Sequence, residues 1–155
     1  MKGANAVKSL VVYFSAGGTT ASLAKMIADM TGSDLFEIVP ETPYTAGDLD
    51  WTDPGARCNR EHESGADVPV AGRVKNLADY DLIFLGFPIW YEQAPNIVAT
   101  FCKGYDWTGK SVALFATSGG SGMGGTEKAL LPYMKGATIV HAQVMQRPEE
   151  PTDPV

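Results

Sequence analysis

Three runs of apolar residues constrain the fold of this chain more than any other feature. They cover residues 9–14, 82–85 and 112–116, and they lack the alternation of apolar and polar side chains that a half-exposed strand shows. Such runs are typical of strands covered on both faces, as the inner strands of a parallel sheet are. Residues 35–39 include a glutamate and residues 138–144 mix apolar with polar side chains, so both segments are predicted to be outer strands.

Helical spacing appears between these predicted strands. Apolar residues recur at intervals of three and four after Thr19, Pro95 and Thr126, and a short helix is also expected over residues 73–77. The residues that carry the spacing are Leu23, Met26, Ile27, Met30, Ile97, Val98, Phe101, Leu130, Tyr133 and Met134. The alternation of strand and helix predicts an α/β fold, in which a doubly wound, five-stranded parallel sheet has helices on both faces.

Charge and cysteine content exclude several classes of function. Acidic residues outnumber basic ones by 18 to 12, and the net charge of -6 disfavours nucleic acids and anionic membranes as partners. Cys58 and Cys102 lie in unlike surroundings and the two histidines show no ligand spacing, so neither a disulfide nor a metal site is expected. No apolar run approaches the ~18 residues of a membrane span and no signal peptide is recognisable, so we expect a cytoplasmic protein.

The loop after the first predicted strand suits a phosphate group. It consists of Ser15, Ala16, Gly17, Gly18, Thr19 and Thr20. The glycines let the backbone turn tightly and present its N–H groups, and the N-terminus of the following helix adds partial positive charge. The same residues would also make an ordinary helix cap, so both interpretations stay open on this loop alone. The lysine of a nucleoside-triphosphate loop is absent.

Two further loops leave the carboxyl ends of predicted inner strands. One covers residues 86–95 and includes Pro88, Ile89, Trp90 and Tyr91, and the other covers residues 117–125 and includes Thr117, Ser118, Gly119, Gly120, Ser121 and Gly122. Adjacent aromatic rings are costly to leave in water, and a run of glycines lets a ligand lie against bare backbone. A single exposed ring and a flexible loop without ligand are the plain alternatives. Because ligands bind at this edge of a parallel sheet, the three loops together predict a site for a phosphorylated flat heterocycle, which FMN fits.

These segments resemble the flavodoxin family, and in particular its short members that are classed as flavoproteins. The resemblance rests on residues 13–20, 40–45, 48–50, 88–91 and 117–122, and it extends to about Val144. It implies FMN as the cofactor, with the phosphate on the first loop and the isoalloxazine ring between the other two. The implied cofactor-binding residues are Ser15, Ala16, Gly17, Gly18, Thr19, Thr20, Pro88, Ile89, Trp90, Tyr91, Thr117, Ser118, Gly119, Gly120, Ser121 and Gly122.

Two departures from the family pattern affect these expectations. Gly17 stands where the family has serine or threonine, which removes one side-chain donor to the phosphate. The family also has a helix after the last strand, whereas residues 147–155 contain three prolines, which disfavour a helix. We expect residues 1–146 to form the FMN-binding domain and residues 147–155 an acidic, proline-rich tail. The sheet face without its last helix would be buried in a homodimer or under this tail.

Residues 40–72 interrupt the regular alternation and are rich in proline, glycine, aspartate and threonine. A long irregular segment in a compact domain is usually either functional or disordered. We expect residues 43–65 to form a lid over the cofactor edge, with Tyr44 and Trp51 as its apolar anchors. A mobile insertion is the alternative.

The leading functional hypothesis is an FMN-binding redox protein that exchanges electrons with a partner protein or a small molecule. An electron carrier and an NAD(P)H-dependent reductase are both compatible with the sequence, and no catalytic acid–base pair is required because the flavin supplies the chemistry. The alternative is a non-catalytic binding or assembly module that keeps the fold without tight cofactor. A hydrolase is disfavoured, because Met123 replaces the last glycine of a nucleophile elbow around Ser121.

Overall fold

The computed structural model describes residues 8–16, 18–90, 94–118 and 126–146, and its central feature is a five-stranded parallel sheet. The strands are β1 (Ser9–Tyr13), β2 (Asp34–Glu37), β5 (Leu82–Pro88), β6 (Ser111–Ser118) and β7 (Thr138–Gln146). Their order is β2-β1-β5-β6-β7, and every neighbouring pair is parallel. The predicted α/β fold is therefore confirmed, and the three apolar runs form the three inner strands.

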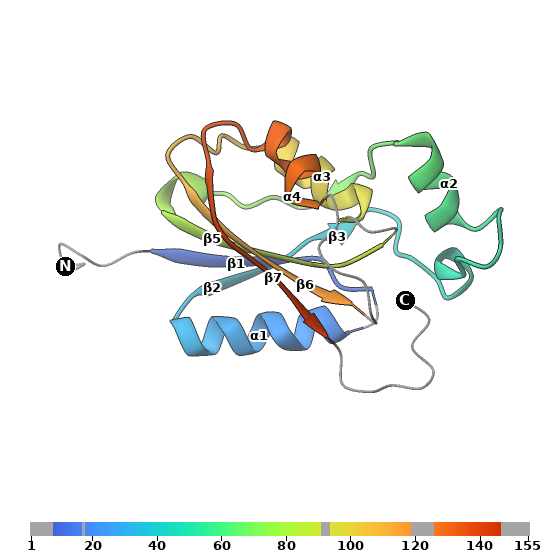
Figure 1. The fold of residues 1–155 in the computed structure, drawn as a ribbon, viewed down its shortest axis with the longest axis horizontal. Helices are drawn as coiled ribbons and strands as arrows, with labels where there is room; N and C mark the ends of the chain where they lie inside the picture. Colours follow the sequence, from blue (N-terminus) through green and yellow to red (C-terminus); the bar gives the residue numbers. More distant parts are fainter. Residues whose placement is uncertain (1–7, 17, 91–93, 119–125, 147–155) are drawn as a thin grey trace.

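Helices cover both faces of the sheet (Figure 1). Helix α1 (Thr19–Thr31) lies on one face, and α3 (Asn96–Lys103) and the short α4 (Thr126–Leu130) lie on the other. A 3-10 turn, η3 (Leu131–Tyr133), continues α4. The expectation of a helix over residues 73–77 was wrong: these residues form no α-helix, and only the short 3-10 turn η2 (Leu77–Asp79) begins at Leu77.

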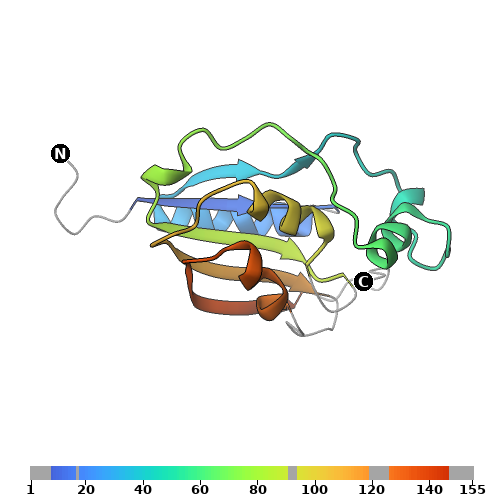
Figure 2. The ribbon, with the colours of Figure 1, turned by 90° about the horizontal axis from the view of Figure 1, so that it is seen from above.

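The long segment between β2 and β5 has secondary structure of its own. It contains the antiparallel pair β3 (Val39–Pro40) and β4 (Val70–Ala71), the 3-10 turn η1 (Gly47–Leu49) and helix α2 (Arg57–Ser64). Helix α2 projects beyond the carboxyl ends of the sheet strands (Figure 2). The sequence did not predict α2, because Cys58 is its one buried residue and it therefore has no apolar stripe.

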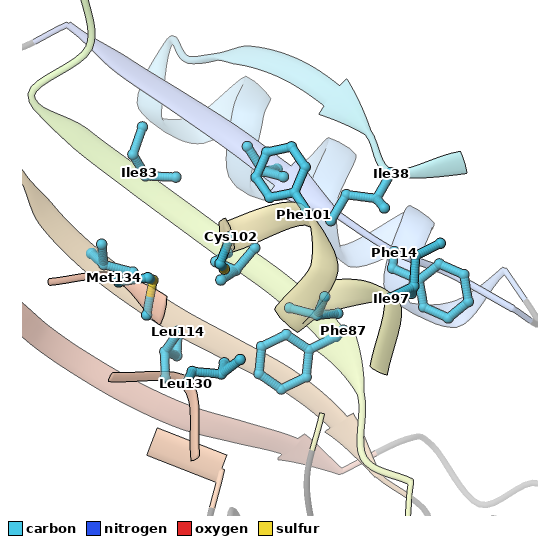
Figure 3. Close-up of a cluster of buried hydrophobic side chains, with 14 of the residues drawn as sticks. Phe14, Ile38, Ile83, Phe87, Ile97, Phe101, Cys102, Leu114, Leu130 and Met134 are labelled. Atoms are coloured by element: carbon cyan, nitrogen blue, oxygen red, sulfur yellow. The ribbon is translucent and has the colours of Figure 1, made fainter. Parts of the chain in front are cut away.

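The larger hydrophobic core lies between the sheet and α3 and α4. Figure 3 shows Phe87 of β5 near Ile97 of α3 and Leu130 of α4, Leu114 of β6 next to Leu130, and Phe101 further along α3. All five side chains are buried, as the helical spacing around Pro95 and Thr126 predicted for the α3 and α4 members.

Helix α1 packs on the other face through small residues. Thr20, Ala24 and Ala28 are buried at a spacing of four residues, whereas Met26 and Met30 are 56% and 78% exposed. Met26 and Met30, which helped to carry the helical spacing, therefore face away from the sheet. Residues two positions apart lie on roughly opposite sides of a helix, so the burial of Ala24 and Ala28 leaves Met26 and Met30 toward solvent.

Several expectations concern residues outside the described parts of the chain. The tail over residues 147–155 is among them, so the division at residue 146, the absent last helix and the homodimer stay predictions. Within the described residues, no helix has the length and apolar character needed to cross a membrane.

Candidate functional site

The carboxyl ends of β1, β5 and β6 meet at one edge of the sheet, and the predicted loops leave from this edge. Backbone hydrogen bonds hold the strand ends together: Phe14 N donates to Gly86 O at 2.9 Å, and Ile89 N donates to Thr117 O at 2.9 Å. Ile89, Thr117 and Ser118 are buried. The described parts of the three predicted loops are therefore brought together as the fold class requires.

The N-terminus of α1 has the features of an anion site. Gly18 precedes the helix with φ +94°, in the left-handed region that glycine tolerates, and its N–H donates to Ser15 Oγ at 3.1 Å. The N–H groups of the first turn have no acceptor within the helix. In α1, all of which the structure describes, the first turn carries no acidic side chain that would compete with an anionic ligand.

Thr20 connects this helix end to β6. Its hydroxyl lies 2.8 Å from the hydroxyl of Thr117, and both side chains are buried. This bond joins residues 97 positions apart and holds the phosphate-type loop against the end of β6. A hydroxyl can donate and accept at the same time, so the role of Thr20 as a phosphate ligand stays a prediction. Gly17 lies outside the described residues.

An aromatic cluster of Phe14, Tyr44 and Trp90 lies at the same edge. The centroid of the Trp90 ring lies 5.7 Å from the centroids of both Phe14 and Tyr44, with interplanar angles of 87° and 88°. Phe14 and Tyr44 are also edge to face, at 6.0 Å. Such T-shaped contacts fix the orientation of each ring relative to the others. Trp90 is half-buried, so part of its ring surface stays open to a ligand.

Tyr44 reaches this cluster from the long segment between β2 and β5. Its hydroxyl donates to Glu61 Oε1 of α2 at 2.5 Å. Burial, followed by the hydrogen bond and the charge of Glu61, raises the pKa of Tyr44 far above its ordinary value, so the phenol stays protonated. Trp51, expected to be a second anchor, is 46% exposed, and this part of the lid hypothesis finds no support in the structure.

Two cysteines and a small hollow are the other features of chemical interest among the described residues. Burial raises the pKa of Cys102 to about 12, so its thiol is protonated at neutral pH and is a poor nucleophile. Cys58 is buried too, and it lines a small hollow of about 10 Å³ with His62, Trp90 and Asn96. No group of three histidine, cysteine or acidic side chains in the described parts of the chain could hold a metal ion.

Sequence reasoning located part of this site. The loop after β1 and Trp90 lie where the motifs predicted, and Tyr44 was predicted as an anchor. Phe14 was assigned to a strand and not to the site, although it directly precedes the phosphate-type loop. Predicted site residues Gly17, Tyr91, Gly119, Gly120, Ser121 and Gly122 lie outside the described residues.

Comparisons with known proteins agree with this arrangement. A family model described as Flavodoxin matches residues 8–152. A protein from Bacteroides uniformis that is classed as a flavoprotein is 39% identical, with 90% of each chain covered and a TM-score of 0.83. A protein of the same class from Bacteroides eggerthii is 37% identical, covers 90% of this chain and 88% of its own, and also has a TM-score of 0.83.

A more distant structure has the same fold. It is a flavoprotein from Lactobacillus acidophilus in complex with FMN, 24% identical, with 90% of this chain and 93% of that chain covered and a TM-score of 0.68. The search of curated proteins returned no match.

Proposed function

The chain belongs to the flavodoxin family, and from this premise we propose that it is a redox protein that binds FMN. One observation carries the proposal: the N-terminus of α1 and the aromatic cluster lie at the same edge of the sheet, at the ends of β1 and β5. A phosphate bound at the helix end and a flat ring bound beside Trp90 would correspond to the phosphate and the isoalloxazine ring of one FMN molecule. The Lactobacillus acidophilus flavoprotein, which has this fold, is in complex with FMN.

The phosphate end of FMN fits the donors present. A phosphate dianion needs several N–H or O–H donors, and the start of α1 offers such donors with no acidic side chain in its own first turn. A Cβ placed on Gly18 would meet no atom within 4 Å, so there is open space beside this part of the loop. Ser15 and Thr19 add hydroxyl groups. We assign the phosphate to Ser15, Ala16, Gly17, Gly18, Thr19 and Thr20.

The ring end fits the aromatic cluster. Trp90 is held by perpendicular contacts with Phe14 and Tyr44, so its orientation is set before a ligand arrives. Ile89 and Pro88 hold the base of this loop, since Ile89 N is bonded to Thr117 O. We assign the flavin ring to Pro88, Ile89, Trp90 and Tyr91, and its pyrimidine side to Thr117, Ser118, Gly119, Gly120, Ser121 and Gly122.

FMN, when bound, supplies the reversible uptake and release of electrons. The residues of this chain bind it, orient the ring and exclude water from one side of it. The net charge of -6 opposes additional negative charge on a bound ring, and this lowers its reduction potential. An electron carrier and an NAD(P)H-dependent reductase would both use the site in this way.

Purified protein provides the direct test. FMN is titrated into protein freed of flavin, and binding is followed by quenching of flavin fluorescence. Riboflavin, which lacks the phosphate, is the matched control and should bind more weakly because it leaves the start of α1 unused. Failure to bind FMN would contradict the proposal and favour a module that keeps the fold without the cofactor. Reduction of the complex by NADH and by NADPH then separates a reductase from a carrier.

A further inference from the structure

The segment between β3 and β4 consists of a stretch that leads from β3 to α2, then α2, then a stretch that leads from α2 to β4. The second stretch, residues 65–69, lies along α3, where three side chains on one helix face bond to it. Asn96 Nδ2 donates to Ala66 O at 3.0 Å, Thr100 Oγ1 accepts from Val68 N at 3.0 Å, and Lys103 Nζ pairs with Asp67 at 2.6 Å. These side chains are spaced as on one face of a helix, so residues 66–68 are attached to α3 at three points.

The first stretch, which leads from β3 to α2, is bound by the side chain of Arg57. The guanidinium Nη1 donates to Thr42 O at 2.7 Å and to Pro43 O at 3.3 Å, and Nε donates to Glu61 at 2.7 Å. The same group lies over the ring of Tyr44, with its Cζ 3.9 Å from the ring centroid. Asp48 adds a longer ion pair at 3.9 Å. We call Thr42, Tyr44, Asp48, Arg57 and Glu61 the Arg57 cluster.

Arg57 stands at a position where the helix dipole disfavours a positive charge, so its contacts outweigh this unfavourable interaction. Arg57 is the first residue of α2, where the positive end of the helix dipole disfavours a cation. Its side chain and that of Glu61 are only 16% and 17% exposed, so their ion pair is less screened than one on the open surface. Only the planar guanidinium can bond in its plane to carbonyl and carboxylate oxygens while its face covers an aromatic ring.

Arg57 therefore acts on the site through Tyr44. The arginine covers one face of the Tyr44 ring, Glu61 accepts a hydrogen bond from the Tyr44 hydroxyl, and the Tyr44 ring contacts Trp90 edge to face. We propose that Arg57 is a positioning residue for the flavin: it holds Tyr44 against Trp90 and so sets the orientation in which Trp90 meets the FMN ring. This inference rests on the proposed function, since it concerns the same site.

The test compares substitutions at Arg57 with a matched change on the same helix. Arg57→Met removes the charge and the bonds but keeps most of the aliphatic stem. Arg60→Met is the control, because Arg60 is exposed and its Nε donates to Gly55 O at 2.9 Å, away from Tyr44. Arg57→Lys keeps the charge without the planar group, and Tyr44→Phe keeps the ring without the bond to Glu61. FMN affinity and the visible circular dichroism of the bound flavin are measured at saturation for each protein.

We expect Arg57→Met to weaken FMN binding about tenfold and to change the dichroism of the bound flavin, because Trp90 then meets the ring in a different orientation. Arg57→Lys and Tyr44→Phe should show smaller changes in the same direction, and Arg60→Met should match the parent. If Arg57→Met does not fold, as judged by far-ultraviolet circular dichroism, the Lys and Phe variants decide.

Two results would overturn the inference while leaving the proposed function intact. One is unchanged affinity and dichroism in the Arg57 variants. The other is weaker binding with an unchanged spectrum at saturation, which would reduce Arg57 to a structural role. A parent protein that fails to bind FMN is a different result, since it overturns the proposed function and this inference with it.

Discussion

Replacing Gly86 with alanine should destabilise the fold strongly, because the ring of Phe115 occupies the space that a side chain would need. Gly86 lies on the face of β5 toward α1, opposite Phe115 in the neighbouring strand β6. A Cβ built on Gly86 would lie 2.0 Å from Phe115 Cζ and 2.2 and 2.6 Å from the two Cε atoms. Carbon atoms in contact are separated by about 3.5 to 4.0 Å, so the ring would have to move by roughly 1.5 Å or more.

Neither residue can relax easily. Gly86 is in an inner strand, and Phe115 is 5% exposed and packs in the cluster beneath α1. Overpacking of a core costs about 1 to 3 kcal/mol, and contact with three ring atoms places this change near the upper end of that range. For a chain of this length, a loss of ~3 kcal/mol corresponds to a fall in Tm of roughly 6 to 12 °C.

Urea and thermal unfolding of Gly86→Ala measure this loss, with Gly47→Ala as the matched control. A Cβ on Gly47 meets no atom closer than 3.9 Å and the residue has no positive φ, so its stability should change little. The double variant Gly86→Ala with Phe115→Leu, compared with Phe115→Leu alone, isolates the clash, and adding the alanine should cost less there. Equal losses from Gly86→Ala in both backgrounds would refute the reasoning.

Three further predictions concern the site and its surroundings. Trp90→Ala should weaken FMN binding by about 1 to 2 kcal/mol, the scale of an aromatic contact, and an unchanged Kd in a fluorescence titration would remove Trp90 from the site. Thr20→Val should weaken FMN more than riboflavin if its hydroxyl bonds the phosphate, whereas equal losses for both ligands would show that Thr20 acts through its bond to Thr117. Burial raises the pKa of Cys102 from 9.0 to about 12, so the stability that its neutral thiol contributes is present below pH 9 and is lost as the pH rises toward 12. Unfolding experiments between pH 8 and 11 should therefore show a shallower fall in stability for Cys102→Ala than for the parent, and equal slopes would contradict this assignment.

The inner strands could be predicted because their signal is local. A strand buried on both faces needs an uninterrupted apolar run, and three such runs locate β1, β5 and β6. The packing face of α1 could not be read in the same way. Its spacing drew attention to large residues such as Met26, whereas the sheet is approached through Ala24 and Ala28, whose small size is a feature of packing and not of hydrophobicity.

The candidate site was predictable only as far as its motifs are continuous in the chain. The phosphate-type loop and Trp90 each lie in a short recognisable segment, but the contacts that orient them come from far along the sequence. Thr20 meets Thr117 across 97 residues, and Tyr44 meets Trp90 from a segment whose helix had no apolar pattern to reveal it. Composition marked that segment as a functional or mobile excursion without saying which.

The described contacts favour a functional role for this segment over a merely mobile insertion. A mobile loop has few buried contacts, whereas here a half-buried phenol bonds a carboxylate that also accepts from Arg57. The Tyr44 ring in turn contacts Trp90 edge to face, and Trp90 belongs to the strand-end loop of β5 and not to the segment itself. A displacement of α2 would therefore shift Tyr44, and with it the aromatic cluster at the edge where we place the flavin. A segment coupled in this way can respond to the cofactor, and cleavage by protease within residues 43–65 should be slower with FMN than without it. Equal cleavage rates in the two conditions would show that the coupling does not extend to the ligand.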